Sequence, residues 1–369
     1  MTPVPVAAPP FLPGKTPASL RPIRLMIVDD SAIARTVLTR MLSAHRDLEV
    51  AATAANAVEA LAVLRKIRFD AILLDVEMPG TSGLEALPDI LRLGEGARVL
   101  IISSLCEEGA EATVKALALG AADTLPKPGA SAFAGRFSDT MAERVRRLGR
   151  VERGRTGAAT SPSFSQIRLR PWPDVMPACL ALGASTGGLH ALGEFLRALP
   201  RTIDIPILVT QHLPQLFLPV FARQIEAASG RAACVARDGD AVDGTRLLLA
   251  PGDAHIGLEN RAGGIRVRLD RHAASSNCMP SVDVMLAAAA EHYGSGATGL
   301  IFSGMGRDGL VGAQRIADAG GAILVQDRAT SAVWGMPGAV AQAGLASAIL
   351  APRDLAARLA AQMRAPAWS

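Results

Sequence analysis

Short apolar segments alternate with helical segments along most of this chain, and that alternation constrains its fold more than any other feature. In residues 23–150 an apolar strand pattern is followed by a helical pattern five times. This alternation predicts a doubly wound α/β domain with a parallel sheet, whose functional residues lie beyond the carboxyl ends of the strands. The alternation returns in residues 176–360 and predicts a second α/β domain with a largely parallel sheet. A length of 369 residues exceeds the usual size of one core, so two domains are also expected from length.

Three segments lack the alternation and are predicted to lie outside both domains. Residues 1–22 are rich in proline and alanine without the apolar core of a signal peptide, which predicts a disordered tail. Residues 151–175 predict a flexible, arginine-rich linker, and residues 361–369 a C-terminal tail. Arginines far outnumber acids between Arg144 and Arg170, which allows a nucleic-acid-binding arm. Since no recognition motif accompanies them, no nucleic-acid partner is expected.

Composition argues against two further classes of protein. The four cysteines show no C-x-x-C spacing, which fits a reducing cytoplasm better than a disulfide framework. No uninterrupted apolar stretch approaches the ~18–20 residues of a membrane span, so no membrane insertion is expected. We therefore expect a cytoplasmic protein.

Polar side chains stand at the predicted strand ends of the first domain: Asp29, Asp30, Asp75, Ser103 and Lys127. Carboxylates that converge at one sheet edge repel each other unless a divalent cation joins them, and Mg²⁺ prefers such ligands. A lysine and a hydroxyl opposite them would bind phosphoryl oxygens, and a carboxylate can accept phosphate covalently. Taken singly, the aspartates could cap a helix and the lysine could be a surface charge. Together, the five residues favour a phosphoryl site.

The second domain opens on a strand-to-helix corner, Gly-Ala-Ser-Thr-Gly-Gly at residues 183–188. The glycines do not fit the phosphate-binding patterns G-x-x-x-x-G-K-[ST] and G-x-G-x-x-G. They fit the nucleophile elbow G-x-S-x-G with Ser185 at the corner, although a tight turn alone could use the same residues. An elbow serine needs a base. His212 directly follows the next strand and is the best-placed candidate, and His255 is its strongest rival.

The acid that would orient such a base has several candidates. Asp308 lies in a glycine-rich loop after a strand, and Asp327 and Asp253 compete with it. A chain order of serine, histidine and aspartate differs from that of the α/β-hydrolases, so a triad here would belong to a separate fold. The residues alone leave the choice of acid open.

Four motifs of the first domain, "MIVDDS", "LLDVEMPGTSGLEAL", "IISS" and "LPKP", resemble the receiver domain of bacterial response regulators. The resemblance implies a flavodoxin-like fold with Asp75 as the phosphoacceptor. The implied Mg²⁺ ligands are Asp29, Asp30, Asp75 and the backbone carbonyl of Glu77, and the implied sensors of the phosphoryl group are Ser103 and Lys127. Thr124 departs from the pattern, since family receivers often carry an aromatic switch residue there. We expect the signal to pass to the partner surface by a different rearrangement.

The second domain carries "LGASTGG", "TQHLP", "APGD", "PSVDVML", "SGMGRDG" and "QDRATSAVWGMP", which resemble the catalytic domain of the chemotaxis methylesterases in the family's order. This resemblance implies an α/β esterase domain with Ser185 as nucleophile, His212 as base and Asp308 as the orienting acid. The backbone N–H of Met305 would serve the oxyanion hole, with Thr186 beside the nucleophile.

Met279 departs from the family pattern, since relatives usually carry an arginine or histidine directly before "PSVDV". The departure keeps open a hydrolase of the same chemistry that acts on another ester or amide. A third interpretation, a response regulator whose second domain only binds a partner, predicts a missing triad member. All three members are present.

Together the two resemblances imply a phosphorylation-activated serine esterase. It would hydrolyse glutamyl γ-methyl esters on the cytoplasmic helices of chemoreceptors and release methanol, with glutamine deamidation as a second activity. A chemotaxis histidine kinase would be the phosphodonor. Mg²⁺ would be needed only in the receiver, and the esterase would need no cofactor. The implied location is the cytoplasm, at chemoreceptor arrays.

Overall fold

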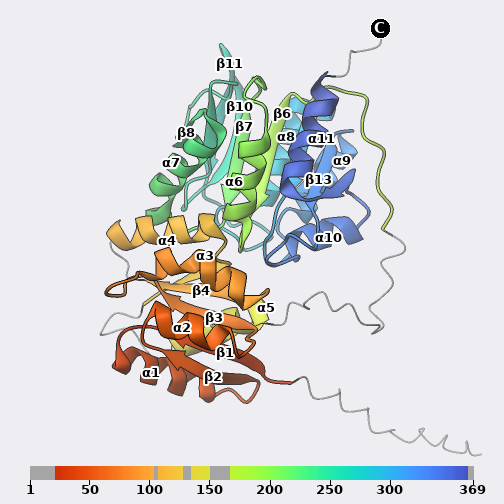
Figure 1. The fold of residues 1–369 in the computed structure, drawn as a ribbon. Coiled ribbons are helices and arrows are strands. Elements are labelled where there is room, and N and C mark those ends of the chain that lie inside the picture. The colour runs from red at the N-terminus through yellow and green to blue at the C-terminus, as the bar shows by residue number, and fades with distance from the viewer. Residues whose placement is uncertain (1–20, 104–106, 128–133, 150–166, 365–369) are drawn as a thin grey trace, which may run out of the picture.

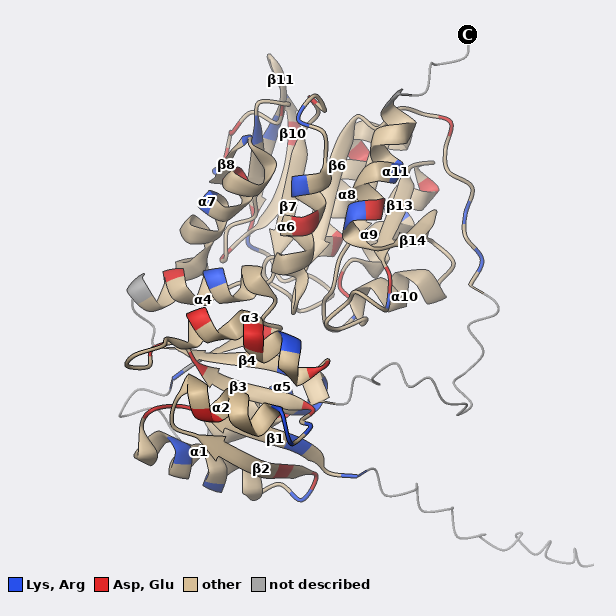
Figure 2. Ribbon diagram, viewed as in Figure 1, with Lys and Arg blue, Asp and Glu red and all other residues tan. Residues whose placement is uncertain are grey.

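The computed structural model describes residues 21–103, 107–127, 134–149 and 167–364 (Figure 1). Two parallel sheets, one in each half of the chain, organise these residues. The central strands of the C-terminal sheet consist of uncharged residues, and charged side chains are frequent on the helices and loops (Figure 2). Continuous apolar strands are expected where helices cover both faces of a parallel sheet. Within the described residues, no helix is long and apolar enough to cross a membrane.

The N-terminal sheet is five-stranded with the order β2-β1-β3-β4-β5, and every pairing is parallel. This is the flavodoxin-like order that the resemblance implied. Its strands are β1 (Ile23–Val28), β2 (Leu48–Ala54), β3 (Ala71–Asp75), β4 (Arg98–Ser103) and β5 (Asp123–Pro126). Its helices are α1 (Ala32–Ser43), α2 (Ala57–Leu64), α3 (Gly83–Gly94), α4 (Glu107–Leu119) and α5 (Ala134–Gly149). Buried side chains of α1 and α5 share one core, and those of α2, α3 and α4 belong to another.

The C-terminal sheet is seven-stranded with the order β14-β13-β12-β6-β7-β9-β8, again parallel throughout. The strands are β6 (Cys179–Ala184), β7 (Ile207–Gln211), β8 (Ala232–Val235), β9 (Arg246–Leu249), β12 (Ala297–Ile301), β13 (Ala322–Gln326) and β14 (Ala348–Leu350). The helices are α6 (Gly188–Ala198), α7 (Leu218–Ser229), α8 (Val282–Tyr293), α9 (Leu310–Asp318), α10 (Met336–Gln342) and α11 (Pro352–Arg364), with 3₁₀ turns η1 (Gln215–Phe217) and η2 (Gly294–Gly296). Both predicted doubly wound domains are confirmed.

An antiparallel hairpin of β10 (His255–Arg261) and β11 (Gly264–Asp270) adds to the predicted pattern. The first four residues of β10 are buried, and Ile256, Leu258 and Val267 join the core beneath α8. The segment alternates apolar and charged residues, as expected for a strand with one solvent-facing side. It projects from the upper edge of the C-terminal domain (Figure 1).

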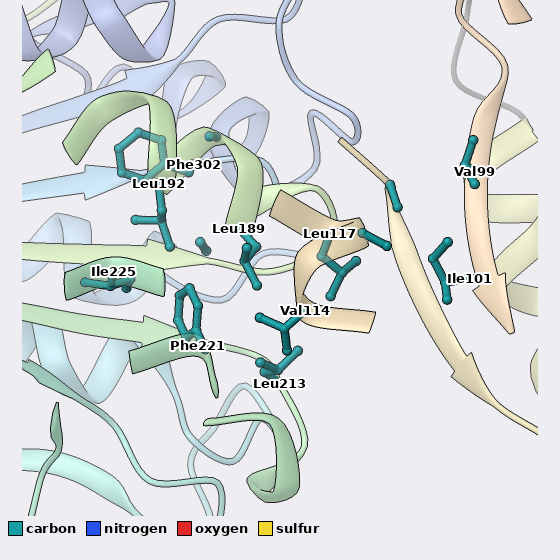
Figure 3. Packing of buried hydrophobic residues seen from close by; sticks show 14 of the residues in the cluster. Val99, Ile101, Val114, Leu117, Leu189, Leu192, Leu213, Phe221, Ile225 and Phe302 are labelled. Atoms are coloured by element: carbon teal, nitrogen blue, oxygen red, sulfur yellow. The ribbon is translucent and has the colours of Figure 1, made fainter. Parts of the chain in front are cut away.

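The two domains share an apolar core. The cluster beneath α2, α3 and α4 continues into the cluster formed by α6, α7 and α11. Val114 and Leu117 of α4 lie beside Leu189 and Leu213 of the C-terminal domain (Figure 3). The carbonyl of Ala118 also accepts a hydrogen bond from His190 Nδ1 at 2.7 Å. Helix α4 therefore joins the two domains.

The segment boundaries differ in detail from those expected. Most of the predicted tail and residues 151–166 of the predicted linker lie outside the described residues. From residue 167 the chain packs on the C-terminal domain, where the Arg358 guanidinium stacks 4.7 Å from the Trp172 ring centroid. At the other end, α11 continues to Arg364 and passes the expected boundary at 360.

Two arginines at the start of the arginine-rich stretch make ion pairs within the N-terminal domain. Arg144 pairs with Asp123 at 3.0 Å, and Arg146 with Asp47 at 2.8 Å. Both arginines belong to α5. The first arginines of the stretch therefore belong to a packed helix that ends before the predicted linker at residues 151–175.

Candidate active site

Ser185 occupies the sharp corner between β6 and α6, as the elbow pattern predicts. The corner requires glycine on both sides of it. A Cβ on Gly183 would lie 2.3 Å from a Val282 methyl group. Gly187 has a backbone φ of +74°, which residues other than glycine rarely adopt. The Ser185 N–H donates to the Ser303 carbonyl at 3.0 Å, which ties the corner to the loop after β12.

His212 and Asp308 meet at the same sheet edge because β7 and β12 flank β6. His212 directly follows β7, and its N–H donates to the Ala184 carbonyl at the end of β6 at 3.1 Å. Its Nε2 lies 2.8 Å from Asp308 Oδ2. The other ring nitrogen is left for a serine proton. No hydrogen bond joins Ser185 Oγ to this ring within the described residues, and both side chains line the same cavity.

Asp308 is almost fully buried and accepts several hydrogen bonds in addition to that of His212. The donors are the Ser281 hydroxyl at 2.8 Å and the N–H groups of Val282 at 2.8 Å, Asp283 at 3.1 Å and Gly309 at 3.1 Å. Burial by itself raises the pKa of Asp308, but the bonds from His212 and the backbone outweigh it and hold the pKa well below its usual range. The carboxylate is therefore ionised and fixed in orientation.

Electrostatics around His212 favour its protonated form. Burial by itself lowers the pKa of the imidazole, but the hydrogen bond to Asp308 and the thiol of Cys278 outweigh burial and raise the pKa to about 9. Cys278 was not predicted as part of the site. No motif or spacing in the sequence pointed to Cys278, because only the folded chain brings the loop before α8 into contact with His212.

From this environment we predict that kcat/KM for ester hydrolysis rises with pH and levels off near the His212 pKa of about 9. Only the neutral imidazole can take the serine proton, and below its pKa the ring is mostly protonated. Initial rates across a pH series test this. Cys278→Ser should move the midpoint to lower pH, because the thiol contributes to the raised pKa. A profile already flat near neutral pH contradicts the prediction.

The rival base and acids have other roles. Both ring nitrogens of His255 contact backbone groups: Nε2 lies 2.9 Å from the His272 carbonyl, and Nδ1 accepts from the Ser281 N–H at 2.9 Å. Asp327 accepts from the Thr330 N–H at 2.9 Å, and Asp253 lies on the surface beside Arg271. The geometry therefore favours His212 and Asp308 over these alternatives.

Two backbone N–H groups beside Ser185 make no hydrogen bond within the described residues, those of Thr186 and Met305. They are the donors that the resemblance placed at an oxyanion hole. Ser303, which was not predicted, positions both loops: its hydroxyl lies 2.7 Å from the Thr186 carbonyl, and it accepts from the Val333 N–H at 3.0 Å. The sequence signal that could have identified Ser303 is its position in the glycine-rich "SGMG", shortly after a predicted strand.

The N-terminal domain covers this site. Ser185, Thr186 and His212 line a cavity of about 20 Å³, and Leu117, Ala121, Ala122 and Asp123 of the N-terminal domain form the rest of its wall. The Gly187 N–H donates to the Ala122 carbonyl at 2.7 Å, and Arg147 donates to Met305 Sδ at 2.7 Å. A space of this size holds about one water molecule. An ester-bearing side chain cannot reach Ser185 in this arrangement.

The predicted phosphoryl site lies at the carboxyl ends of β1, β3, β4 and β5. Carboxylate oxygens of Asp29, Asp30 and Asp75 lie within 4.8 Å of one another. Lys127 Nζ donates to Asp75 Oδ2 at 2.5 Å and lies 3.8 Å from Asp29 Oδ2. Burial raises the pKa of Asp75, and hydrogen bonds from Lys127 and the Glu77 N–H offset only part of this effect.

The predicted sensor residues are placed close to that site. Ser103 ends β4, and its hydroxyl accepts from Thr113 Oγ1 on α4 at 2.7 Å. Lys127 donates its N–H to the Ser103 carbonyl at 2.8 Å. Thr124 is buried, and its carbonyl accepts from Arg144 at 2.6 Å. Asp123, the residue before it, lines the cavity at Ser185. Strand β5 thus runs from the covered active site to the phosphoryl site.

Comparison with known proteins agrees with both halves of the chain. Residues 180–359 match the family model of the CheB methylesterase, and residues 25–132 match that of the response regulator receiver domain. A protein-glutamate methylesterase/protein-glutamine glutaminase of group 2 operon from Rhodospirillum centenum is 38% identical over 378 residues, with 93% of this chain and 96% of the relative covered. The chain belongs to the CheB methylesterase family.

A second family member, the protein-glutamate methylesterase/protein-glutamine glutaminase of Azospirillum brasilense, is 36% identical over 359 residues, which cover 90% of this chain and 91% of the relative. The crystal structure of the Thermotoga maritima CheB methylesterase catalytic domain matches with 34% identity and a TM-score of 0.48, covering 50% of this chain and 98% of that one. The two family models account for one domain each, the receiver at residues 25–132 and the esterase domain at 180–359.

Proposed function

We propose that this CheB family member hydrolyses glutamyl γ-methyl esters on chemoreceptor helices through Ser185, and that phosphorylation of Asp75 opens the site. The observation that carries the proposal is the 2.8 Å contact of His212 with an Asp308 carboxylate fixed at the sheet edge where Ser185 stands. Deamidation of receptor glutamines is the second activity, since an amide carbonyl undergoes the same attack.

The proposed chemistry uses the chain's own residues. His212 takes the proton of Ser185 Oγ as the oxygen attacks the ester carbonyl, and Asp308 stabilises the imidazolium that forms. The N–H groups of Thr186 and Met305 would bind the developing oxyanion. His212 then gives its proton to the leaving oxygen, and methanol departs. Water, activated by the same histidine, hydrolyses the acyl-enzyme to glutamate.

The proposed phosphoryl site also fits a divalent cation. Asp29 Oδ2 is buried and accepts no hydrogen bond within the described residues, so an acceptor faces the cluster without a donor. Asp29, Asp30 and Asp75, with the Glu77 carbonyl, would hold Mg²⁺, which when bound neutralises the repulsion between the carboxylates and an incoming phosphoryl group. An oxygen of Asp75 would attack the phosphorus of a histidine kinase's phosphohistidine, the P–N bond would break, and the kinase's histidine would leave as the free imidazole after taking up a proton from water. Lys127 would then pair with a phosphoryl oxygen in place of the carboxylate.

Methanol release from methylated receptor membranes tests the proposal. We expect release by wild type to increase when Mg²⁺ and a small-molecule phosphodonor are added, and Asp75→Ala to lose that increase while it keeps its basal rate. The variant removes the acceptor carboxylate, whose hydrogen bonds come from Lys127 and the Glu77 N–H of the N-terminal domain. Stimulation that persists in Asp75→Ala would move the phosphoacceptor elsewhere. Cleavage of a generic ester without release from receptors would leave the chemistry standing and overturn the substrate.

A second prediction concerns the covered state. Leu117→Asp should raise the unstimulated rate roughly tenfold or more, because an unpaired carboxylate is costly to bury between the domains and opens the closed form. Leu119→Asp on the same helix is the matched control, since Leu119 is 45% exposed. Rates without phosphodonor are compared in both variants. An unchanged basal rate in Leu117→Asp would show that the receiver does not limit access to Ser185.

A further inference from the structure

Cys278 completes a cluster of three different ligand types at the catalytic centre. His212, Cys278 and Asp308 each offer one ligand atom, and these three atoms lie within 4.8 Å of one another. An imidazole nitrogen, a thiol sulfur and a carboxylate oxygen are the groups that bind Zn²⁺ in proteins. Atoms around a tetrahedral zinc are roughly 3.3–3.8 Å apart, so small side-chain shifts would bring these three into place. The cluster therefore has the composition and approximate spacing of a zinc site.

The loop that carries Cys278 is held in place beside Asp308. The Cys278 N–H donates to Ser276 Oγ at 3.3 Å, and Ser276 Oγ lies 3.1 Å from Ser281 Oγ. Ser281 in turn donates to Asp308 at 2.8 Å and gives its N–H to His255 at 2.9 Å. The Cys278 backbone and the Asp308 carboxylate are thus linked through Ser276 and Ser281, and the thiol donates to the Ser276 carbonyl at 3.7 Å. A site on rigid supports loses little entropy when a cation binds.

The cluster also carries the charge that a cation requires. Asp308 is 4% exposed, and the hydrogen bonds from Val282, Asp283 and Gly309 keep it as a carboxylate. The route in is open to an ion, since the His212 side chain is 19% exposed and Cys278 is half-buried. A thiol distinguishes this cluster from the acidic cluster at Asp75, which offers oxygen ligands alone. Thiolate favours Zn²⁺ over Mg²⁺.

We propose that His212, Cys278 and Asp308 form an inhibitory site for a thiophilic divalent cation, Zn²⁺, with water as the fourth ligand. On binding, Cys278 loses its thiol proton and His212 loses the proton on its ligating nitrogen, both to water, so that the thiolate and the imidazole become ligands. A nitrogen lone pair of His212 passes to the metal, so the ring can no longer serve as the base for Ser185. The inference rests on the proposed role of His212, and it makes the esterase reversibly sensitive to free zinc.

Metal binding is tested on the full chain with Co²⁺ as a spectroscopic substitute for zinc. We expect wild type to show a thiolate-to-cobalt charge-transfer band in the near ultraviolet, and added Zn²⁺ to displace it. Cys278→Ser should lose the band. Cys234→Ser should keep it, because Cys234 lies in β8 beside Arg246. Asp75→Ala should also keep it, which separates this site from the receiver. A band that survives in Cys278→Ser overturns the proposal.

Inhibition is measured as the rate of each variant with zinc relative to its own metal-free rate. We expect the zinc concentration for half-inhibition to rise roughly 10–100-fold in Cys278→Ser and to stay unchanged in Cys234→Ser. A chelator should restore the wild-type rate. Equal inhibition of wild type and Cys278→Ser overturns the proposal, and so does inhibition reversed only by a reductant, which would indicate thiol oxidation. A cobalt band without any methanol release would leave the metal site standing and overturn the proposed reaction.

Discussion

Replacement of Ser185 by alanine is expected to lower methanol release by about 10⁶-fold, the largest effect of any single change in this chain. In the proposed reaction, alanine removes the oxygen that attacks the carbonyl, and the remaining N–H donors could stabilise only a transition state for attack by water. The corner itself should persist, because Gly183 and Gly187 set its geometry and the Ser185 N–H bond to Ser303 uses the backbone.

The matched control for this variant is Ser347→Ala. Ser347 lies in the same domain, and its buried hydroxyl has no hydrogen-bond partner among the residues that the structure describes, so its loss should leave the rate unchanged. Methanol release is measured for both variants after phosphodonor addition, with circular dichroism to confirm the fold. A Ser185→Ala rate within about tenfold of wild type would assign the nucleophile to another residue.

Asp308→Asn is expected to lower kcat by roughly 10⁴-fold. The amide has the shape of the carboxylate but no charge to stabilise the His212 imidazolium. The asparagine NH₂ group would also replace an oxygen that accepts hydrogen bonds in the wild type, so a donor would face a donor from Ser281, Val282 or Asp283. Each buried donor left unpaired costs about 1–3 kcal/mol, so we also expect a lower Tm.

Asp327→Asn serves as the control, because Asp327 also follows a strand of the same sheet and was a rival for the orienting role. Its carboxylate accepts bonds from Thr330 and does not contact His212. The kcat of each variant is measured with the phosphodonor present. If Asp327→Asn lost more activity than Asp308→Asn, the orienting acid would have to be reassigned.

The alternation of apolar and helical segments predicts the two parallel-sheet domains and the sheet edge at which each site lies. Apolar runs such as "ILVTQ" and "AILVQ" are buried strands covered by helices, and their local pattern is independent of the rest of the chain. Because parallel strands end at one edge, the loops that follow β6, β7 and β12 were expected to lie together. Ser185, His212 and Asp308 could therefore be chosen as candidates before any distance was known.

The position of a residue at a strand end did not show which of the candidates meet in one site, and the folded structure was needed to see this. His255 also stands at a strand terminus, and only the backbone groups around its ring exclude it as the base. Cys278 and Ser281 reach Asp308 because the loop before α8 packs across the end of β12. The closure of the site by Ala122 and Asp123 depends on how two separate domains pack. These contacts join segments distant in the chain, and side-chain packing between such segments leaves no periodic signal in the sequence.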